Sequence, residues 1–462
     1  MRVGKRQRTE AKETLSEELK RYGYVFSKKK TLISLLFVFI LTFLLGRFFS
    51  LNLISNIILT IFTIILLPFF YKNSAESEYV QQRFSDVNTY MEQFLYSFEK
   101  TGKILDTLKD TEQLFSKGTM KKKISMAIHH IENSYESISE KAALQIIERE
   151  YELDGIEKIH NFALNVEKEG GEYRKNSGIL LEDRRMWTNR IFEYLKQKRT
   201  LKTKVTLSIL FTLLLCSMIY LLGNKMNIDI SKNNFVQIGT TFVICMDILI
   251  YYLSDKKMAK ADFMEKPKKY DLAVKKQKYW LSVKRGAKKV KFKSISKFKF
   301  NLDKKVISKQ IEKDFPKWLL SLSLLLQNYN VQVAIEKSYD MAPLIIKPHI
   351  IELTEKLRMN PVGIEPYLSF MSEYTLPDVK TAMKALYSLS ENGNGSSGDE
   401  IKELLERNHT MMDKAFRLEN EDRLSGFLIL FFMPQITGGI KLIVDMMALF
   451  GTYLSNFSVL KG

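Results

Sequence analysis

Residues 31–46 read TLISLLFVFILTFLLG, and residues 51–70 read LNLISNIILTIFTIILLPFF. Neither stretch contains a charged side chain, and each is close to the length that a helix needs to cross a hydrocarbon core of about 30 Å. Helices of this length in soluble cores normally carry a polar face. We therefore expect these two stretches to span a membrane rather than to fill the core of a soluble domain.

Three more apolar stretches follow later in the chain. Residues 205–222 and 235–253 form a second pair, separated by a short polar loop. Residues 426–460 form the last stretch, which Pro434 and two adjacent glycines interrupt. Because this stretch is longer than one straight span needs, it is either a kinked single span or a tight hairpin.

The distribution of lysine and arginine predicts the orientation of the spans. Residues 1–30 hold ten basic side chains against four acidic ones. Basic residues beside a span favour the cytoplasmic side of the membrane. We therefore expect a multi-pass protein of the cytoplasmic (inner) membrane with a cytoplasmic N-terminus, with residues 71–204 and 254–425 on the same side and the 223–234 loop outside.

The two long polar blocks have the pattern of amphipathic helices. Residues 76–203 contain no proline, and their apolar side chains recur at three- and four-residue spacing. About six helices packed as a bundle would account for that block. Residues 310–424 show the same spacing, with breaks at prolines and at the glycine-rich residues 390–399. Neither block shows an alternation typical of strands, so the sequence predicts an all-α protein.

The two polar blocks resemble each other in layout. Residues 98–108 of the first block read FEKTGKILDTL, and residues 325–335 of the second read LLQNYNVQVAI. Each opens the second helix of its block. The turns EKEGGE at 167–172 and ENGNG at 391–395 precede the next apolar stretch by similar distances. Direct identity is low, and a duplication is the economical account of this layout.

At this point the first block resembles a known family. Gly102 lies in KTGKILDTL, two glycines begin GGEYRKNSGILLEDRR at 170–185, and Arg190 follows shortly before the apolar stretch. This order is similar to the F-domain of type II secretion and type IV pilus platform proteins, particularly the Tad-type pair. The resemblance covers residues 71–222 best. It covers 310–460 loosely, because NGNG replaces the glycine pair there and the arginines are scattered.

The resemblance implies two F-domains in one chain that acts as a platform at the base of an assembly machine. It implies a cytoplasmic hexameric secretion ATPase and prepilin-like subunits as partners, and we expect a homo-oligomer. The residues that the resemblance suggests for partner binding are Gly102, Gly170, Gly171, Glu182, Arg184 and Arg185.

Both motifs among these residues have a simpler interpretation. The pair Gly170-Gly171 could cradle a phosphate, but no GxxxxGK[ST] motif surrounds it, and a plain helix cap is favoured. The charged run 182–185 could dock a partner, or it could be a solvated helix face with salt bridges.

Residues 254–309 are strongly basic, with twenty Lys or Arg residues against five acidic ones. Such a segment beside a cytoplasmic span attracts anionic lipid headgroups, and its interleaved aromatic residues suit a membrane interface. Nucleic acid is a competing partner and a solvated linker is another alternative, but we expect lipid and no nucleic acid. The basic residues that we expect to face lipid are Lys284, Arg285, Lys288, Lys289, Lys291 and Lys293.

Few residues suggest catalysis, metal binding or disulfide formation. Two cysteines without CxxC and five histidines without HExxH argue against a disulfide framework, a zinc site and a metalloenzyme. We expect no active site, no cofactor and no metal, and we expect His129, His130 and His160 at the surface. Asp247 lies inside an apolar stretch, where a carboxylate is costly and is a functional candidate. Cys216, Ser217 or Tyr220 could satisfy it without any transport role.

The predicted organisation is an all-α polytopic membrane protein with two cytoplasmic helical-bundle modules. Its segments are a basic tail (1–30), a transmembrane pair (31–70), a first helical module (71–204), a second transmembrane pair (205–253), a basic juxtamembrane linker (254–309), a second helical module (310–425) and the C-terminal transmembrane region (426–460).

Two other functions compete with the platform. A small-solute transporter or channel would need several charged or helix-breaking residues at mid-membrane, whereas Asp247 is nearly alone in this interpretation. A membrane sensor would need an output domain, and no kinase or cyclase motif is present.

Overall fold

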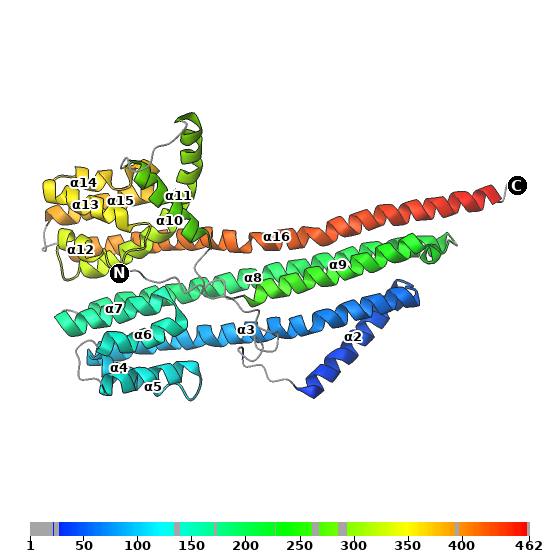
Figure 1. The fold of residues 1–462 in the computed structure, drawn as a ribbon, viewed down its shortest axis with the longest axis horizontal. Helices are drawn as coiled ribbons and strands as arrows, with labels where there is room; N and C mark the ends of the chain where they lie inside the picture. The colour runs from blue at the N-terminus through cyan, green and yellow to red at the C-terminus, as the bar shows by residue number, and fades with distance from the viewer. Residues whose placement is uncertain are drawn as a thin grey trace. The chain divides into compact units, whose positions relative to one another are not determined.

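The computed structural model describes residue 22 and residues 27–133, 139–170, 173–226, 228–260, 268–284, 293–392 and 397–459. Every regular element among these residues is a helix, which confirms the all-α prediction (Figure 1). In chain order the α-helices are α2 (Lys28–Phe48), α3 (Leu53–Thr101), α4 (Ile104–Glu112), α5 (Thr119–Glu132), α6 (Ser139–Tyr151), α7 (Asp154–Glu169), α8 (Tyr173–Lys225), α9 (Asn234–Ala259), α10 (Lys268–Lys284), α11 (Lys293–Leu325), α12 (Val331–Lys337), α13 (Lys347–Met359), α14 (Glu365–Ser369), α15 (Pro377–Asn392) and α16 (Ser397–Val459). The short 3₁₀ helices η1 (Ile230–Lys232) and η2 (Ser372–Tyr374) complete the described elements.

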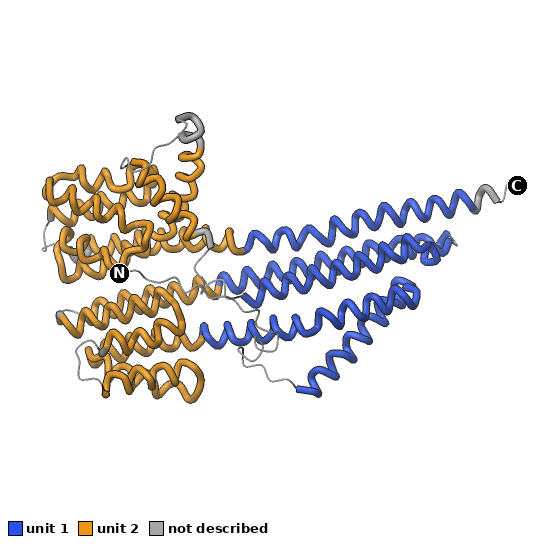
Figure 2. The backbone as a smooth tube through the Cα atoms, viewed as in Figure 1, with its two compact units in different colours: residues 1–84, 193–261, 424–462 blue, residues 85–192, 262–423 orange. Residues whose placement is uncertain are grey.

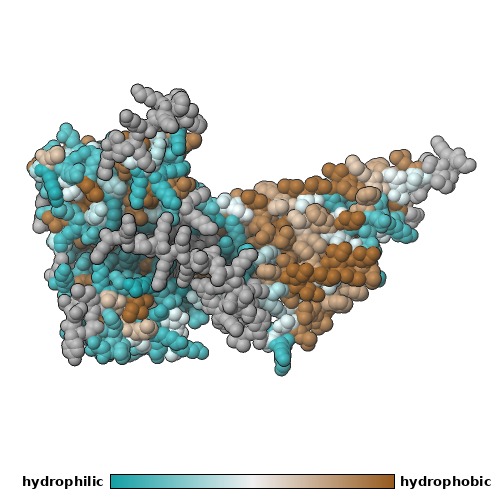
Figure 3. Space-filling view, viewed as in Figure 1, coloured by the Kyte–Doolittle hydropathy of each residue, from teal (hydrophilic) through white to brown (hydrophobic). Residues whose placement is uncertain are grey.

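The chain forms two compact units (Figure 2). We call residues 1–84, 193–261 and 424–462 the apolar unit, and residues 85–192 and 262–423 the polar unit. Within the described residues, five helices are long and apolar enough to cross a membrane: α2, α3, α8, α9 and α16. Figure 3 shows apolar side chains gathered on the surface of the apolar unit. These helices indicate a membrane protein.

Polar side chains join the loops at one end of the apolar unit. Gln237 on α9 accepts a hydrogen bond from the Asn52 backbone N–H at 3.0 Å. Its amide nitrogen donates to the Ser50 carbonyl at 2.9 Å and to the Ser231 carbonyl at 2.8 Å. One buried amide therefore holds the α2–α3 turn against the loop that precedes α9, and all three bonds satisfy backbone groups that helices leave free.

Helix α16 settles the alternative left open for residues 426–460. It continues without a break from Ser397 to Val459 with Pro434 inside it, so this region is a single helix and not a hairpin. Proline inside a span is tolerated when neighbouring groups satisfy the displaced carbonyls. Ser208 on α8 donates to the Phe431 carbonyl at 2.8 Å, three residues before the proline, and so bonds α8 to α16 at this point. A Cβ atom on Gly438 would overlap Thr212, so the glycine permits the close approach of α8 and α16.

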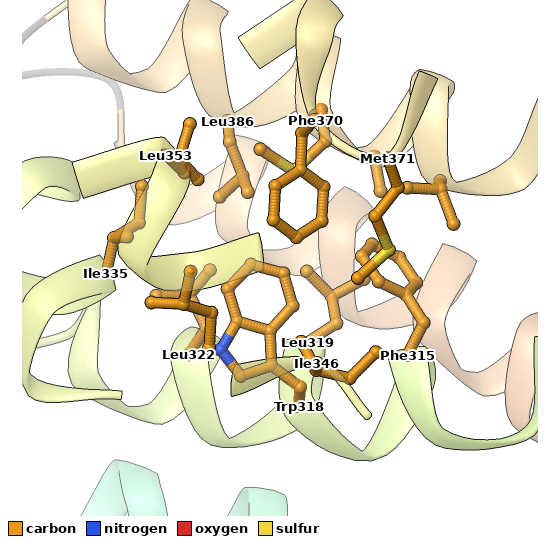
Figure 4. Close-up of a cluster of buried hydrophobic side chains, with 14 of the residues drawn as sticks. Phe315, Trp318, Leu319, Leu322, Ile335, Ile346, Leu353, Phe370, Met371 and Leu386 are labelled. Carbon is orange, nitrogen blue, oxygen red and sulfur yellow. The ribbon is translucent and has the colours of Figure 1, made fainter. Parts of the chain in front are cut away.

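The polar unit contains two clusters of buried apolar side chains. The first lies among α3 to α8 and includes Phe94, Phe98 and Ile104. The second lies among α10 to α16 and surrounds Trp318 (Figure 4). The Trp318 ring stacks on Phe370 with centroids 5.5 Å apart, and its indole N–H donates to Ser338 Oγ at 2.8 Å. The indole is therefore buried without an unsatisfied donor.

The order of helices repeats along the chain. Helices α4 to α7 lie between α3 and α8, and helices α12 to α15 lie between α11 and α16. The lengths of chain that separate the start of α4 from the start of α12, and the start of α8 from the start of α16, are nearly equal. The buried positions repeat in a similar way. Val87, Phe94 and Phe98 are buried, and adding one constant number to each position gives Ile311, Trp318 and Leu322, which are also buried.

The basic segment 254–309 is more than a linker. All of α10 and the first half of α11 fall within it, and Ala273 and Gln277 of α10 are buried. The Gln277 amide donates to the Ile345 carbonyl at 2.7 Å, and the Trp280 indole donates to Asp303 at 2.9 Å. The apolar and amide side chains between the lysines therefore pack α10 onto the second cluster. A count of charged residues does not reveal this periodic burial.

Candidate functional site

The glycines that the sequence analysis selects lie at helix ends. Gly102 follows α3 with φ +65°, and Gly170 follows α7 with φ +72°. Each donates its N–H to a carbonyl of the preceding helix, Phe98 and Val166 respectively, at 2.8 Å. This geometry is the helix cap that the sequence favours over a phosphate cradle. Gly171 lies outside the described residues.

The two adjacent arginines of α8 point in different directions. Arg184 is 11% exposed and donates to Asn88 Oδ1 at 2.9 Å and to Glu92 Oε2 at 3.0 Å, both on α3. Arg185 is 70% exposed and lies 3.8 Å from Glu182 on its own helix. Arg184 therefore joins α8 to α3, whereas Glu182 and Arg185 form the solvated helix face.

Arg190 contributes to a cavity of about 190 Å³ within the polar unit. Its guanidinium lies 3.1 Å from Asp413 on α16 and 3.9 Å from Asp183 on α8. Lys158 and Lys313, which also line the cavity, lie 3.0 Å from Asp183 and 3.1 Å from Asp422. Because these cations already have carboxylate partners, the cavity is a network of ion pairs rather than an open anion site.

The described part of the chain places one of the expected lipid-facing side chains. Lys284 is exposed at the end of α10 and lies 3.9 Å from the Glu373 carboxylate. Lys293 begins α11, but its side chain is outside the described part. The other four, Arg285, Lys288, Lys289 and Lys291, lie outside the described residues.

A second glycine motif occurs between the last two helices. Residues 393–398 read GNGSSG, which fits the pattern GxGxxG. That pattern binds a dinucleotide only where it follows a strand and opens a helix. Here it follows helix α15, so the context for dinucleotide binding is not met.

The surface position expected for His160 is wrong, whereas His129 and His130 are exposed as expected. His160 is fully buried, with its ring nitrogens 2.7 Å from Tyr90 Oη and 2.8 Å from Glu148 Oε1. Burial lowers the pKa of His160, while the Glu148 carboxylate opposes that shift. Burial also raises the pKa of Tyr90, with Glu148 adding to the shift.

The helical pattern contains the signal for this burial. His160 lies four residues after Ile156 and three before Ala163, both buried on the inner face of α7. Tyr90, His160 and the partly exposed Glu148 form a chain of hydrogen bonds beside the first cluster, so the buried hydroxyl and imidazole groups both have partners.

Sequence reasoning missed an ion pair inside the last apolar helix. Lys441 and Asp445 of α16 lie one turn apart and bond to each other, with their side chains 2% and 0% exposed. The Lys441 ammonium lies 5.5 Å from the centroid of the Tyr220 ring on α8. A Cβ atom on Gly239 of α9 would lie 3.2 Å from Lys441 Cδ. Three helices therefore enclose this lysine, and its only sequence signal is opposite charges four residues apart in an apolar run.

Asp247 on α9 is 2% exposed and belongs to the same unit. Neither of its carboxylate oxygens has a hydrogen-bond partner among the residues that the structure describes. The partners expected from the sequence are otherwise engaged, since Ser217 donates to the Leu214 carbonyl at 2.7 Å and Tyr220 Oη lies 2.8 Å from Thr240 Oγ1. The Cys216 thiol lies within electrostatic range of Asp247, Lys441 and Asp445. The expected satisfaction of Asp247 is therefore wrong.

No group of three or more His, Cys, Asp or Glu side chains among the described residues could hold a metal ion. Comparison of the chain with protein-family models, with curated proteins and with solved structures finds no match.

Proposed function

We propose that the chain is an inner-membrane platform protein of a Tad-like pilus or type II-like secretion machine. It couples a cytoplasmic hexameric secretion ATPase to the extraction and assembly of prepilin-like subunits, and it works as a homo-oligomer. The observation that carries the proposal is the repeated helix order, in which α12 to α16 follow α4 to α8 at a nearly constant separation along the chain. That order is what two F-domain-like modules in one chain require.

The connection between spans and modules supports a mechanical role. Helices α3, α8 and α16 each contain residues of both units, so each carries the chain from one unit to the other without an intervening loop. The sequence contains no GxxxxGK[ST] motif, so the energy for assembly comes from a partner. We assign the contact with that partner to the exposed face of α8 around Glu182 and Arg185, which precedes the apolar part of the same helix.

The charge distribution supports the proposed orientation. The N-terminus and both modules lie in the cytoplasm, because the basic segments 1–30 and 254–309 flank apolar helices on that side. The lysines around Lys284 bind anionic lipid headgroups at this surface.

Capture of the ATPase tests the proposal. The full chain, tagged and solubilised from its native membrane, is incubated with the purified secretion ATPase of the same organism. We expect stable capture by the wild type and at least a tenfold weaker Kd for a Glu182→Ala, Arg185→Ala double variant, a difference of about 1.4 kcal/mol. Arg149→Ala is the matched control, because Arg149 is an exposed arginine on α6 with one bond within its own helix. A chain that does not bind the ATPase would refute the proposed coupling.

The charged residues in the spans favour a second candidate, a small-solute transporter or channel. Asp247 is not alone there, since Lys441 and Asp445 are also buried in the apolar unit. Ionisable residues within membrane helices often mark ion or substrate pathways. Solute uptake into proteoliposomes that contain only this chain would favour this candidate over the platform.

A further inference from the structure

Asp247 differs from the other charged side chains of the apolar helices. It is almost fully buried in α9, and within the described part of the chain neither of its carboxylate oxygens has a hydrogen-bond partner. Lys441 and Asp445, by contrast, are bonded to each other on α16. Among the described residues, the buried Lys441–Asp445 pair is therefore compensated, whereas the buried Asp247 carboxyl group is not.

An isolated ionised carboxylate is far costlier in a low-dielectric interior than a neutral carboxylic acid. A buried carboxyl group without a cation or a hydrogen-bond donor therefore takes up a proton. Lys441 cannot serve as the missing cation without leaving Asp445, and its ammonium already lies over the Tyr220 ring. Separating that pair would leave a second unpaired carboxylate in the same region.

A metal ion does not fit this position. Hard cations such as Ca²⁺ and Mg²⁺ need about six oxygen ligands, and the described residues hold no cluster of acidic, histidine or cysteine side chains that could supply them. The Cys216 thiol of α8 is the titratable group within electrostatic range of both Asp247 and the Lys441–Asp445 pair of α16, and Tyr220 of α8 lies under the Lys441 ammonium. Because a metal ion does not fit and Lys441 is already paired with Asp445, a proton is the ligand that we assign to Asp247.

We propose that Asp247 is a proton-binding site inside the apolar unit, and that the Lys441–Asp445 ion pair of the same unit stays charged. Binding of one proton by Asp247 leaves the site electrically neutral, and release of that proton leaves one net negative charge among α8, α9 and α16. Packing of these three helices then depends on pH. This inference does not depend on the platform proposal.

Dicyclohexylcarbodiimide tests the protonation state of each carboxyl group. The acid O–H adds across one C=N bond of the reagent, and the adduct rearranges to an N-acylurea that retains all atoms of both partners. We expect full-length protein in neutral detergent at about pH 6 to carry this adduct on Asp247 and not on Asp445, with labelling that falls as the pH rises.

Lys441→Met supplies the matched control for access of the reagent. It leaves Asp445 buried without a cation, so Asp445 also becomes protonated and labelled. Labelling of Asp445 in this variant, together with an unlabelled Asp247 in the wild type, would overturn the proposal.

Thermal unfolding of the full chain gives a second readout that needs no reagent. Asparagine is close in shape to a protonated aspartic acid, so Asp247→Asn should unfold near the wild-type temperature at about pH 4, where the unfolded carboxyl group is also about half protonated. It should unfold at a higher temperature than the wild type at about pH 9, where the wild-type carboxyl group loses its proton. If Asp247 is instead an anion with a bound cation, the variant will be less stable than the wild type at every pH, which would overturn the proposal.

Discussion

The Lys441 ammonium bonds to the Asp445 carboxylate one turn further along α16, and both side chains are closed off from solvent. Each residue is therefore tolerated because of the other. A buried ion pair costs about as much to desolvate as it gains, but removal of one partner leaves an uncompensated charge.

Single and double substitutions of this pair should therefore differ. We expect Lys441→Met or Asp445→Leu to lower the stability of the apolar unit by about 3–5 kcal/mol, or to force uptake or loss of a proton. The double variant Lys441→Met, Asp445→Leu should lie within about 1 kcal/mol of the wild type, because it removes both charges. Thermal unfolding in detergent measures both, and a loss in the double variant equal to the sum of the two single losses would mean that the pair is not coupled.

The buried His160 should make the polar unit sensitive to acid. Because burial lowers the pKa of His160, folding favours the neutral ring, and this contribution is fully present above the unfolded pKa of about 6.5. It is lost as the pH falls below that value toward the folded pKa. Denaturant unfolding of the full chain should therefore show a steeper loss of stability below about pH 6.5 for the wild type than for His160→Gln. His129→Gln changes an exposed ring and serves as the control; an identical slope in all three proteins would contradict the assignment.

Substitutions of Arg184 and Arg185 should have different effects on stability. Arg184→Ala removes hydrogen bonds to Asn88 and to the Glu92 carboxylate, and bonds to charged groups contribute about 1.5–3 kcal/mol. Arg185→Ala should change stability by about 0–1 kcal/mol, since exposed ion pairs contribute little. Denaturant unfolding followed by circular dichroism distinguishes the two. Equal destabilisation by both changes would contradict the different orientations of the two side chains.

The orientation of the chain can be measured by cysteine labelling in intact cells. Lys232 is 85% exposed in the loop before α9, and Ser116 is exposed in the turn before α5. A membrane-impermeant maleimide should label Lys232→Cys and should not label Ser116→Cys until the cells are opened. The native cysteines give a low background, because Cys216 is buried and Cys245 is half-buried. Labelling of Ser116→Cys in intact cells would reverse the assigned orientation.

Hydropathy was sufficient to find the apolar helices, because an apolar run of this length has few alternatives in a folded protein. Hydropathy predicted the ends of these helices poorly. No glycine or proline occurs between Phe70 and Gly102, so α3 continues out of its apolar part and ends only at Thr101. The long apolar run also concealed Lys441 and Asp445, since an average over the window hides two charges of opposite sign.

Side-chain partners could not be predicted from spacing alone. Whether Asp247 meets Tyr220 depends on how α8 and α9 are rotated about their axes, and packing with other helices sets that rotation. In the same way, Arg184 and Arg185 are adjacent in sequence, yet the helix rotates by about 100° per residue and turns one toward α3 and the other toward solvent. The layout of the helices was therefore more predictable than the contacts of any single residue.

The most direct test of the platform proposal is a reconstitution. Proteoliposomes that contain the full chain and a prepilin-like subunit receive the secretion ATPase with ATP, and release of the subunit from the bilayer is measured by protease access. We expect release only when chain, ATPase and hydrolysable ATP are all present, and reduced release with the Glu182→Ala, Arg185→Ala variant. Release that is unchanged when the chain is omitted would contradict the proposal.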